Sequence, residues 1–395
     1  MRILLVTTHN LATNPRLVKE IDLFINRGYS VTVICFAFNN WSEVLNNQLL
    51  QKFDKAKFHV IPVGKKSLFS WIMSTIFERI SKILLLLFPE SAMLISLSYY
   101  KRSYSLKNIL HNLPNEFDWI IAHNPGSFWV SKQYSCKYAI RLGIDMEDYH
   151  PGETNDLKIS KRIKTYLRKT LLFSDYITAA SPLILQYTLE DIKEYAGKTA
   201  IILNSFSINE FKLPKVTNEK KIKLIWFSQH VSFERGLEHF CKVLAEYQDV
   251  FELHLYGKMN PLFFDKVLKD LTNIIYYEPI PQILLHNKLN EFDIGLALEP
   301  GKDLNNSLAL SNKMLAYAQA GLYIIASDTR AQKIMIDQFP AMGIVTSLNK
   351  NELECTLQYI QKNITEIREQ KSKRFIDGTV LSWEDVSEEL IKIVK

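Results

Sequence analysis

Several features that would identify a function directly are missing from this chain of 395 residues. Its four cysteines (Cys35, Cys136, Cys241 and Cys355) lie far apart, no Cys-x-x-Cys pair occurs, and the histidines are scattered. This spacing argues against a zinc site and against a disulfide framework, and it is typical of a reducing compartment. No GxGxxG motif is present, so a dinucleotide cofactor is not expected.

Long apolar runs are also missing. No run of about 18 uncharged apolar residues occurs, so we expect no transmembrane helix. The amino terminus, MRILLVTTHN, becomes polar too early for a signal peptide. With 47% apolar and 23% charged residues, the composition is that of a soluble globular protein, and the length suits two domains. We expect a cytoplasmic protein.

The chain opens with a predicted βαβ unit. Residues 2–7 form an apolar strand, residues 15–27 a helix with proline in its first turn, and residues 30–36 a second strand. The polar loop between the first strand and the helix contains Thr8, His9 and Asn10. Because ligands bind at the carboxyl edge of parallel sheets, these three residues are candidates for contact with a substrate, alongside the alternative of a solvated loop.

Two later strands are predicted to end in chemically active side chains. Residues 117–123, FDWIIAH, form a buried strand that ends at His123 before a Pro-Gly turn, and residues 137–144 form the next strand. Asp145 and Glu147 follow that second strand. His123 is therefore a candidate catalytic base, and Asp145 and Glu147 are candidates to assist it. The carboxylates could ligate Mg²⁺ or only orient the histidine.

Residues 68–88 have helical apolar spacing with a broad stripe, and basic residues surround them. Two segments are rich in bases, 64–107 with a net charge of +5 and 158–169 with no acid within its basic cluster. An apolar stripe beside bases is typical of binding to an anionic membrane surface without spanning it. The alternative is a core helix with a solvated basic edge. Nucleic-acid binding is not expected, since stacking aromatics and a known module are missing.

The second half repeats the α/β pattern. A strand at 223–227 leads to a helix that starts at Arg235-Gly236, and a strand at 251–256 ends at Gly257-Lys258. The stretch 293–328 contains a strand (294–298), a polar loop with residues 305–307, a helix that starts near Ser311 with Asn312 and Lys313, and a strand (322–327). Helix N–H groups with a nearby cation bind phosphate. The two cationic helix starts, at Arg235 and Lys313, therefore predict a diphosphate site.

The ordered series of motifs resembles the GT-B fold of glycosyltransferases, and within it glycosyltransferase family 4. Similar segments include GYSVTVI, DWIIAHNPG, SDYITAASP, IILNSF, LIWFSQHVSFERGLE, ALSNKMLAYAQAGLYIIASD and LSWEDV. The resemblance implies an α/β protein with two Rossmann-like domains facing across a cleft. Residues 1–205 would form the acceptor domain, 206–377 the donor domain, and 378–395 a helix that returns to the first domain.

The resemblance also implies a function. A hexosyl group would pass, with retention of configuration, from a nucleotide-sugar to a glycan or lipid-linked acceptor in cell-surface polysaccharide or glycolipid biosynthesis. Donor contacts would come from Arg235, Lys313, Ser311, Asn312 and Lys258, with His123 near the transferred sugar. No cofactor and no metal would be required. The protein would associate peripherally with the inner face of the membrane through the two basic segments.

The sequence departs from the family where two donor-binding glutamates are usual. Leu308 and Ala316 occupy these positions, and Gln229-His230 replace a Gly-Arg pair. Glu299, at the end of the preceding strand, is the candidate substitute. Two alternatives therefore stay open, a non-catalytic relative that acts as a binding or partner subunit and a nucleotide-sugar 2-epimerase.

Overall fold

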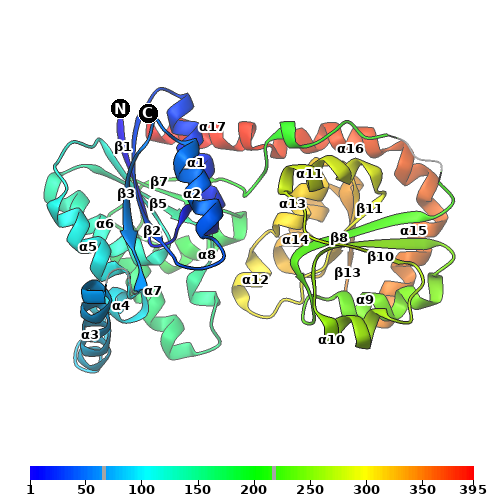
Figure 1. Cartoon of the computed structure of the whole chain (residues 1–395), viewed down its shortest axis with the longest axis horizontal. Helices are drawn as coiled ribbons and strands as arrows, with labels where there is room; N and C mark the ends of the chain where they lie inside the picture. The colour runs from blue at the N-terminus through cyan, green and yellow to red at the C-terminus, as the bar shows by residue number, and fades with distance from the viewer. Residues whose placement is uncertain (65–67, 216–218) are drawn as a thin grey trace. The chain divides into compact units, whose positions relative to one another are not determined.

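The computed structural model describes residues 1–64, 68–215 and 219–395. The described chain divides into two compact units. Unit 1 comprises Met1–Ile202 together with Leu390–Lys395, and unit 2 comprises Leu203–Glu389. Each unit is an α/β domain built on its own parallel sheet (Figure 1).

Unit 1 has the strand order β3-β2-β1-β4-β5-β6-β7, and every adjacent pair is parallel. The strands are β1 (Arg2–Thr7), β2 (Ser30–Ala37), β3 (Lys57–Pro62), β4 (Trp119–His123), β5 (Arg141–Met146), β6 (Tyr176–Ala179) and β7 (Lys198–Ile201). The helices are α1 (Pro15–Asn26), α2 (Glu43–Lys52), α3 (Leu68–Leu84), α4 (Ala92–Tyr99), α5 (Ser103–Asn112), α6 (Pro125–Tyr138), α7 (Leu157–Leu171) and α8 (Pro182–Asp191).

Unit 2 has the strand order β10-β9-β8-β11-β12-β13, again all parallel. The strands are β8 (Ile222–Val231), β9 (Phe251–Met259), β10 (Ile274–Tyr277), β11 (Ile294–Ala297), β12 (Tyr323–Ser327) and β13 (Gly343–Thr346). The helices are α9 (Leu237–Leu244), α10 (Pro261–Phe263), α11 (Gln282–Lys288), α12 (Leu304–Leu308), α13 (Asn312–Gln319), α14 (Arg330–Gln338), α15 (Lys350–Glu369), α16 (Lys371–Gly378) and α17 (Trp383–Val394).

Both sheets contain the doubly wound order 3-2-1-4-5-6, which is the Rossmann arrangement. The prediction of two Rossmann-like domains is therefore confirmed. In each sheet the strand order reverses beside the first strand, between β1 and β4 in unit 1 and between β8 and β11 in unit 2. Side chains at the carboxyl ends of these four strands lie where α/β proteins bind ligands. β4 is buried along its whole length, because helices cover both faces of a parallel sheet.

Two local predictions were wrong. Residues 137–144 were expected to be a strand, but α6 continues to Tyr138 and β5 begins only at Arg141. Ala139 ends α6 in a left-handed conformation with φ of 53°, which apolar periodicity does not reveal. The polar loop expected at residues 305–307 is the short helix α12, whose start is capped by the side chain of Asp303.

Helix α3 packs against unit 1 with its small polar side chains. Its buried residues are Ser74 and Ser81, and Phe77 stacks on Tyr104 of α5. Many of the large apolar residues from this helix to Phe88 are exposed, Phe69 to 78% and Leu86 to 75%, whereas Leu85 is buried. The helix lies at the periphery of unit 1 in Figure 1. Among the helices that the structure describes, none combines the length and the apolar character needed to cross a membrane.

The last residues of α17 belong to unit 1. The indole N–H of Trp119, on β4, donates a hydrogen bond of 3.0 Å to the carbonyl oxygen of Val394. Lys198, on β7, donates to the carbonyl oxygen of Ile393. The end of the chain is therefore attached to the sheet of unit 1.

Candidate functional site

A cavity of about 470 Å³ opens in unit 2 at the carboxyl edge of its sheet. It is lined by the ends of β8 and β9, by the segment that leads into α11, and by the start of α13. The lining includes Gln229, Gly257, Ile280, Glu299, Ser311, Asn312 and Lys313. Four of the predicted donor residues therefore meet in one cavity, Glu299, Ser311, Asn312 and Lys313.

The start of α13 provides hydrogen-bond donors to this cavity. Ser311 is the N-cap, and its hydroxyl accepts a hydrogen bond from the N–H of Met314. The N–H groups of the first turn have no partner within the helix, and with the helix dipole they favour an anion. Lys313 is largely buried, and its ammonium lies 2.7 Å from Oε1 of Glu299 and 5.6 Å from the Trp226 ring centroid.

Glu299 follows β11, and its backbone N–H donates to the hydroxyl of Ser327 at the end of β12. This bond fixes the backbone from which the carboxylate reaches Lys313. The positions of the usual glutamates offer no replacement, because Ala316 and Leu308 are fully buried in the apolar core. Glu299 is thus the acidic side chain among the described residues that line this cavity.

Arg235 and Lys258 do not line the cavity. Arg235 lies in the loop before α9, where Glu234 and Gly236 both have positive φ, 61° and 79°. Lys258 lies near the end of β9 and is exposed. The predicted pairing of Arg235 with Lys313 around one diphosphate is therefore not seen in the cavity, where Lys313 is joined by Glu299 instead.

An aromatic wall of the same cavity was missed by the sequence reasoning. It includes Phe206, Phe227, Tyr256 and His286. His286 stacks on Phe211 at 4.9 Å between ring centroids, and its Nδ1 lies 2.8 Å from Oε2 of Glu210. These residues come from four separate segments with no common motif. Phe227 and Tyr256 lie toward the ends of β8 and β9, which could have suggested them, whereas Phe206 in the connection between the units and His286 in α11 carried no such signal.

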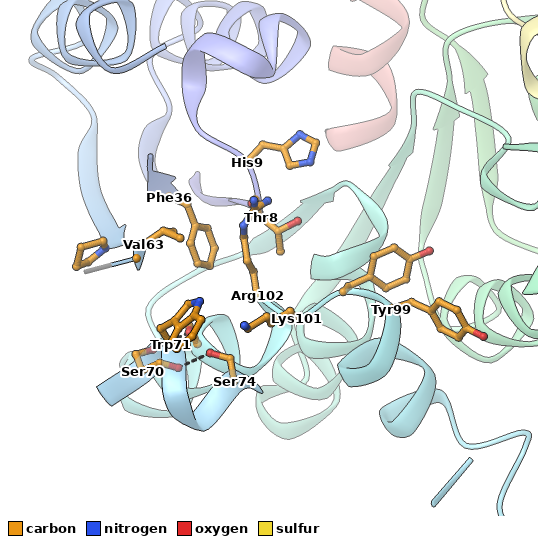
Figure 2. A pocket seen from close by; sticks show the side chains of 14 residues that line it. Thr8, His9, Phe36, Val63, Ser70, Trp71, Ser74, Tyr99, Lys101 and Arg102 are labelled. Atoms are coloured by element: carbon orange, nitrogen blue, oxygen red, sulfur yellow. Dashed lines mark hydrogen bonds between the residues drawn. The ribbon is translucent and has the colours of Figure 1, made fainter. Parts of the chain in front are cut away.

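Thr8 and His9 line a second cavity, of about 450 Å³, in unit 1 (Figure 2). Burial lowers the pKa of His9, and Arg102 lowers it further. Asn10 is fully buried and has a structural use, since its carbonyl caps the turn at Thr13 and its amide donates to Ser42. Of the three predicted acceptor residues, two thus face a cavity and Asn10 does not.

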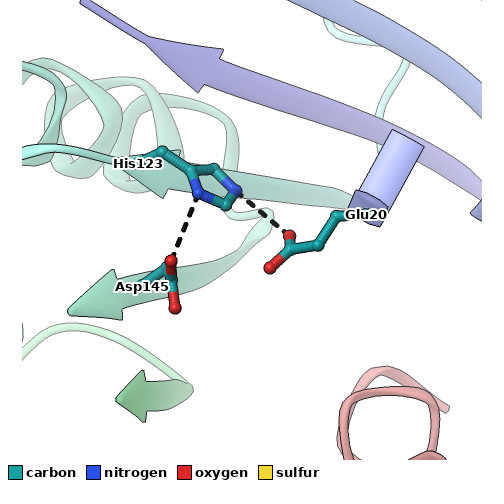
Figure 3. Close-up of side chains that lie close together, drawn as sticks. All are labelled: Glu20, His123 and Asp145. Carbon is teal, nitrogen blue, oxygen red and sulfur yellow. Dashed lines mark hydrogen bonds and ion pairs between the residues drawn. The ribbon is translucent and has the colours of Figure 1, made fainter. Parts of the chain in front are cut away.

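His123 lies at the centre of a buried charge network (Figure 3). Its Nε2 is 3.1 Å from Oε2 of Glu20, and its Nδ1 is 3.3 Å from Oδ2 of Asp145. Glu147 is more distant, at 3.9 Å from Nδ1. His123, Glu20 and Asp145 have at most 1% of their side chains exposed. The predicted catalytic contact of His123 with a sugar is not provided by this geometry, because both ring nitrogens face carboxylates.

The network is held by opposite charges. Nη2 of Arg16 lies 2.7 Å from Oδ1 of Asp145, which also accepts from the hydroxyl of Thr178. Burial alone would lower the pKa of His123, but Glu20, Asp145 and Glu147 raise it well above its ordinary value. Burial would raise the pKa of Asp145, but Arg16 and His123 lower it to about 2. Both partners are therefore charged near neutral pH.

Glu20, His123 and Asp145 place one ligand atom each within 4.8 Å of one another, a spacing that could hold a metal ion. A cation would have to displace Arg16 from Asp145 and a proton from His123, which makes this group a poor metal site. That no metal is required stays a prediction. Arg16 and Glu20 were missed, although their spacing of four residues within the apolar stripe of α1 marked them as buried charges.

The chain directly after His123 is strained. Asn124 has φ of 68° and ψ of 144°, a region that non-glycine residues rarely adopt. Its side-chain oxygen accepts hydrogen bonds from the hydroxyl of Thr7 and the amide of Asn14. Gly126 then packs so closely that a Cβ would lie 2.8 Å from the Thr8 side chain. This strand end is therefore fixed against the Thr8 loop.

The two basic segments differ in the structure. In segment 158–169, three bases pair with acids from elsewhere in unit 1, namely Lys164 with Asp191, Arg168 with Glu194 and Lys169 with Glu90. Its positive charge is thus partly compensated. In segment 64–107, Lys65 and Lys66 lie outside the described residues.

Comparisons with known proteins establish the fold. No family model matches the sequence, and no curated protein matches it. Sucrose-phosphate synthase from Thermosynechococcus elongatus has a similar structure, with a TM-score of 0.67 and 11% identity over 100% of this chain and 98% of that chain. HepE from Anabaena in complex with UDP gives a TM-score of 0.66 and 14% identity over 99% of both chains.

A putative UDP-N-acetylglucosamine 2-epimerase from Listeria monocytogenes is also similar, with a TM-score of 0.52 and 13% identity over 94% of this chain and 90% of that chain. At such identities the likeness shows the fold alone. The chain has the GT-B fold that its motifs predicted.

Proposed function

We propose that the protein is a glycosyltransferase whose nucleotide-sugar donor binds in the unit 2 cavity. The observation that supports it most strongly is the arrangement at the start of α13. Helix N–H groups and Lys313 lie there beside the carboxylate of Glu299. The cation and the N–H groups suit the negative charge that develops on a departing diphosphate, and the carboxylate suits a sugar hydroxyl. HepE, which shares the fold, binds UDP, so uridine nucleotides are the first donors to test.

In this proposal Lys313 exchanges partners when the donor binds. Its ammonium turns from Glu299 to the diphosphate, and the freed carboxylate accepts a hydrogen bond from a hydroxyl of the donor sugar. The bond between the anomeric carbon and the diphosphate oxygen then breaks, a bond between the anomeric carbon and the acceptor oxygen forms, and the proton of the acceptor hydroxyl passes to the departing diphosphate. Because Lys313 and the helix supply positive charge, no metal is required. Retention of configuration follows the family resemblance.

We propose a lipid-linked acceptor at the inner face of a membrane, in surface polysaccharide or glycolipid synthesis. The support is the exposed apolar face of α3, which includes Phe69, Ile72 and Ile76. Arg79 is exposed on the same helix, and Lys82 pairs with Glu78. An apolar helix face with a basic flank suits shallow insertion among anionic headgroups.

The donor proposal is tested by titrating the protein with UDP-, GDP-, ADP-, dTDP- and CMP-sugars and following heat release and thermal stability. Binding of one nucleotide class, weakened in Lys313→Met, is the expected result. Lys362→Met is the matched control, because it removes one charge at an exposed position on α15. If none of the five classes binds, the donor proposal is refuted.

The membrane proposal is tested by flotation with vesicles of phosphatidylglycerol and phosphatidylcholine. The triple variant Phe69→Ser, Ile72→Ser and Ile76→Ser should lose binding with little loss of stability, because Phe69 is largely exposed and Ile72 and Ile76 are about two-fifths exposed. The control Ile376→Ser and Val380→Ser changes exposed apolar side chains in unit 2 and should bind like the wild type. Equal flotation of both variants would contradict the proposal.

Two other functions are each favoured by one observation. The epimerase-like neighbour shares the fold, and an epimerase would convert the donor without any acceptor. The buried Ala316 and Leu308 favour a non-catalytic relative, which would bind no nucleotide-sugar productively. Mass detection of donor products, with and without membrane lipid, separates the three. Turnover that depends on lipid supports the transferase.

A further inference from the structure

The unit 1 cavity has walls from five parts of the chain (Figure 2). The loop after β1 contributes Thr8 and His9, and the ends of β2 and β3 contribute Phe36, Pro62 and Val63. Helix α3 contributes Ser70, Trp71 and Ser74, and the connection from α4 to α5 contributes Tyr99, Tyr100, Lys101 and Arg102. Its volume of about 450 Å³ is in the range of small-molecule sites.

Two adjacent cations face this cavity. The guanidinium of Arg102 donates a hydrogen bond of 3.0 Å to the carbonyl oxygen of Thr8 and lies 4.3 Å from the Phe38 ring centroid. The ammonium of Lys101 donates to the hydroxyl of Thr75 and lies 4.7 Å from the Trp71 ring centroid. These hydrogen bonds and ring contacts hold both cations in place without neutralising their charge.

Neither cation has an ion-pair partner in the described part of the chain. Among the described residues, no carboxylate lies within 4.0 Å of Lys101 or Arg102, unlike Lys164 and Arg168 on α7, which have acidic partners. Arg102 is only partly exposed, and this burial lowers the pKa of its guanidinium. A desolvated cation without a counter-ion is unfavourable, so the cavity favours an anionic ligand.

The other lining groups narrow the ligand class. Arg102 engages the Thr8 carbonyl through Nη1, so other N–H groups of its fork can face an anion, and such a fork matches phosphate oxygens. Ser70, Ser74, Ser105 and Tyr99 add hydroxyl groups to the lining. They are bonded within the protein, Ser70 to Ser105, Ser74 to the Ser70 carbonyl and Tyr99 to Arg162, but each hydroxyl oxygen has further acceptor capacity for a sugar hydroxyl. Trp71 presents a half-exposed ring, which suits the apolar face of a sugar ring. Trp71 also adjoins the exposed apolar face of α3.

We propose that this cavity binds a sugar phosphate group of the acceptor, with Arg102 and Lys101 neutralising the phosphate. The inference rests on the proposed transferase function and names the acceptor's chemistry. The phosphate could belong to a soluble sugar phosphate or to an isoprenoid-linked sugar phosphate. The recognition chemistry is the same for both, and the exposed face of α3 adjoins the cavity in either case.

The test measures binding directly. Glucose 6-phosphate is titrated into the protein by calorimetry, and flotation is measured with phosphatidylcholine vesicles that contain undecaprenyl phosphate-linked glucose or contain no phosphate-linked sugar. Arg102→Gln and Lys101→Gln should each weaken binding about tenfold or more, the effect of losing a charge-assisted contact. Lys137→Gln, an exposed cation on α6 outside the cavity, should bind like the wild type.

Binding of glucose 6-phosphate that falls in the Arg102 variant supports the inference with a soluble source. Binding restricted to the sugar-phosphate vesicles and lost in the same variant supports it with a lipid source. Binding by neither probe, or equal binding by all variants, overturns it. UDP affinity is measured in parallel. If UDP binds and sugar reaches an acceptor without phosphate, the inference fails while the transferase proposal stands. If none of the five nucleotide classes binds, the transferase proposal fails.

A folding defect is separated from a binding defect by two measurements. Arg102→Lys keeps the charge but loses the fork, so affinity between those of the wild type and Arg102→Gln is expected. The imidazole of His9 is followed by NMR, because Arg102 lowers its pKa and a bound phosphate should raise it. A His9 pKa that does not respond to saturating sugar phosphate would place the ligand elsewhere and overturn the inference.

Discussion

Substitutions at Lys313 and Glu299 should change nucleotide affinity in opposite directions. Lys313→Met keeps the aliphatic volume near Trp226 but removes the cation. A charge-assisted hydrogen bond contributes about 1.5–3 kcal/mol, so the Kd for UDP should rise roughly 10- to 150-fold. Titration calorimetry measures this change directly.

Glu299→Gln should instead strengthen the binding of UDP. The carboxylate lies 2.7 Å from the Lys313 ammonium. A phosphate oxygen bonded to Lys313 would then lie within about 6 Å of it, where like charges repel by roughly 2–3 kcal/mol at an effective dielectric constant near 20. Screening reduces this figure, and a gain of about threefold or more in affinity is expected. Transfer should nevertheless fall, because the glutamine cannot replace the carboxylate toward a donor hydroxyl.

The double variant separates binding from stability. Lys313→Met alone leaves the largely buried Glu299 without its cation, which should destabilise unit 2 by about 1–3 kcal/mol. Adding Glu299→Gln removes the unpaired charge and should restore most of the unfolding free energy without restoring UDP affinity. The reasoning would be refuted if Lys313→Met bound UDP like Lys362→Met, or if Glu299→Gln weakened UDP binding.

Three further predictions concern unit 1 and the thiols. Gly126→Ala should lower the unfolding free energy by about 1–3 kcal/mol, because its Cβ would lie 2.8 Å from the Thr8 side chain. Urea denaturation measures this loss, and a midpoint equal to that of the wild type would contradict the prediction. His123→Ala should destabilise by roughly 3–5 kcal/mol near pH 6. Because the folded pKa of His123 is raised above 6.5, its contribution is complete below that pH and declines as the pH rises through the folded pKa. If the difference in unfolding free energy between the wild type and His123→Ala stayed constant across that pH range, the ion pairing of His123 with Glu20 and Asp145 would be refuted. Burial raises the pKa of Cys35 and Cys241 to about 12, so a thiol reagent at neutral pH should label exposed Cys136 and Cys355 first. Mass spectrometry of the labelled peptides checks this order.

Much of the fold followed from the sequence, because parallel strands buried on both faces are apolar without interruption. The helix that starts at Ser311 and the strands on either side of it were predicted close to their observed bounds. The end of α6 and the start of β5 were predicted wrongly, because a single left-handed residue, Ala139, determines where the helix stops. Short local signals of this kind do not appear in apolar periodicity.

The candidate site was predictable only where one segment carries the chemistry. Ser311, Asn312 and Lys313 share a helix start, and the structure places them in one cavity with Glu299. Arg235 was expected to join them because it also precedes a helix, but loop geometry determines where a side chain points. The cavity beside Arg102 unites residues up to 97 positions apart, from Thr8 to Ser105, and only tertiary structure brings them together.

The buried network around His123 gains a role from its connection to that cavity. A strained residue such as Asn124 stores about 1–3 kcal/mol and persists only where its neighbours hold it. His123 is fixed on one side by Glu20 and Asp145, and the hydroxyl of Ser127 donates to the His123 carbonyl on the other. The strand end thus holds the start of α6 against Thr8.

Thr8 in turn supplies the carbonyl that accepts a hydrogen bond from Arg102. The charged network around His123 therefore positions the Thr8 backbone, and the Thr8 carbonyl in turn holds the guanidinium that is proposed to bind phosphate. Through this connection His123 would influence the proposed phosphate binding without touching a sugar. It also predicts that His123→Ala weakens the binding of the phosphate probe while UDP affinity in unit 2 stays unchanged. If both affinities were unchanged in a folded variant, His123 would have no positioning role for the cavity.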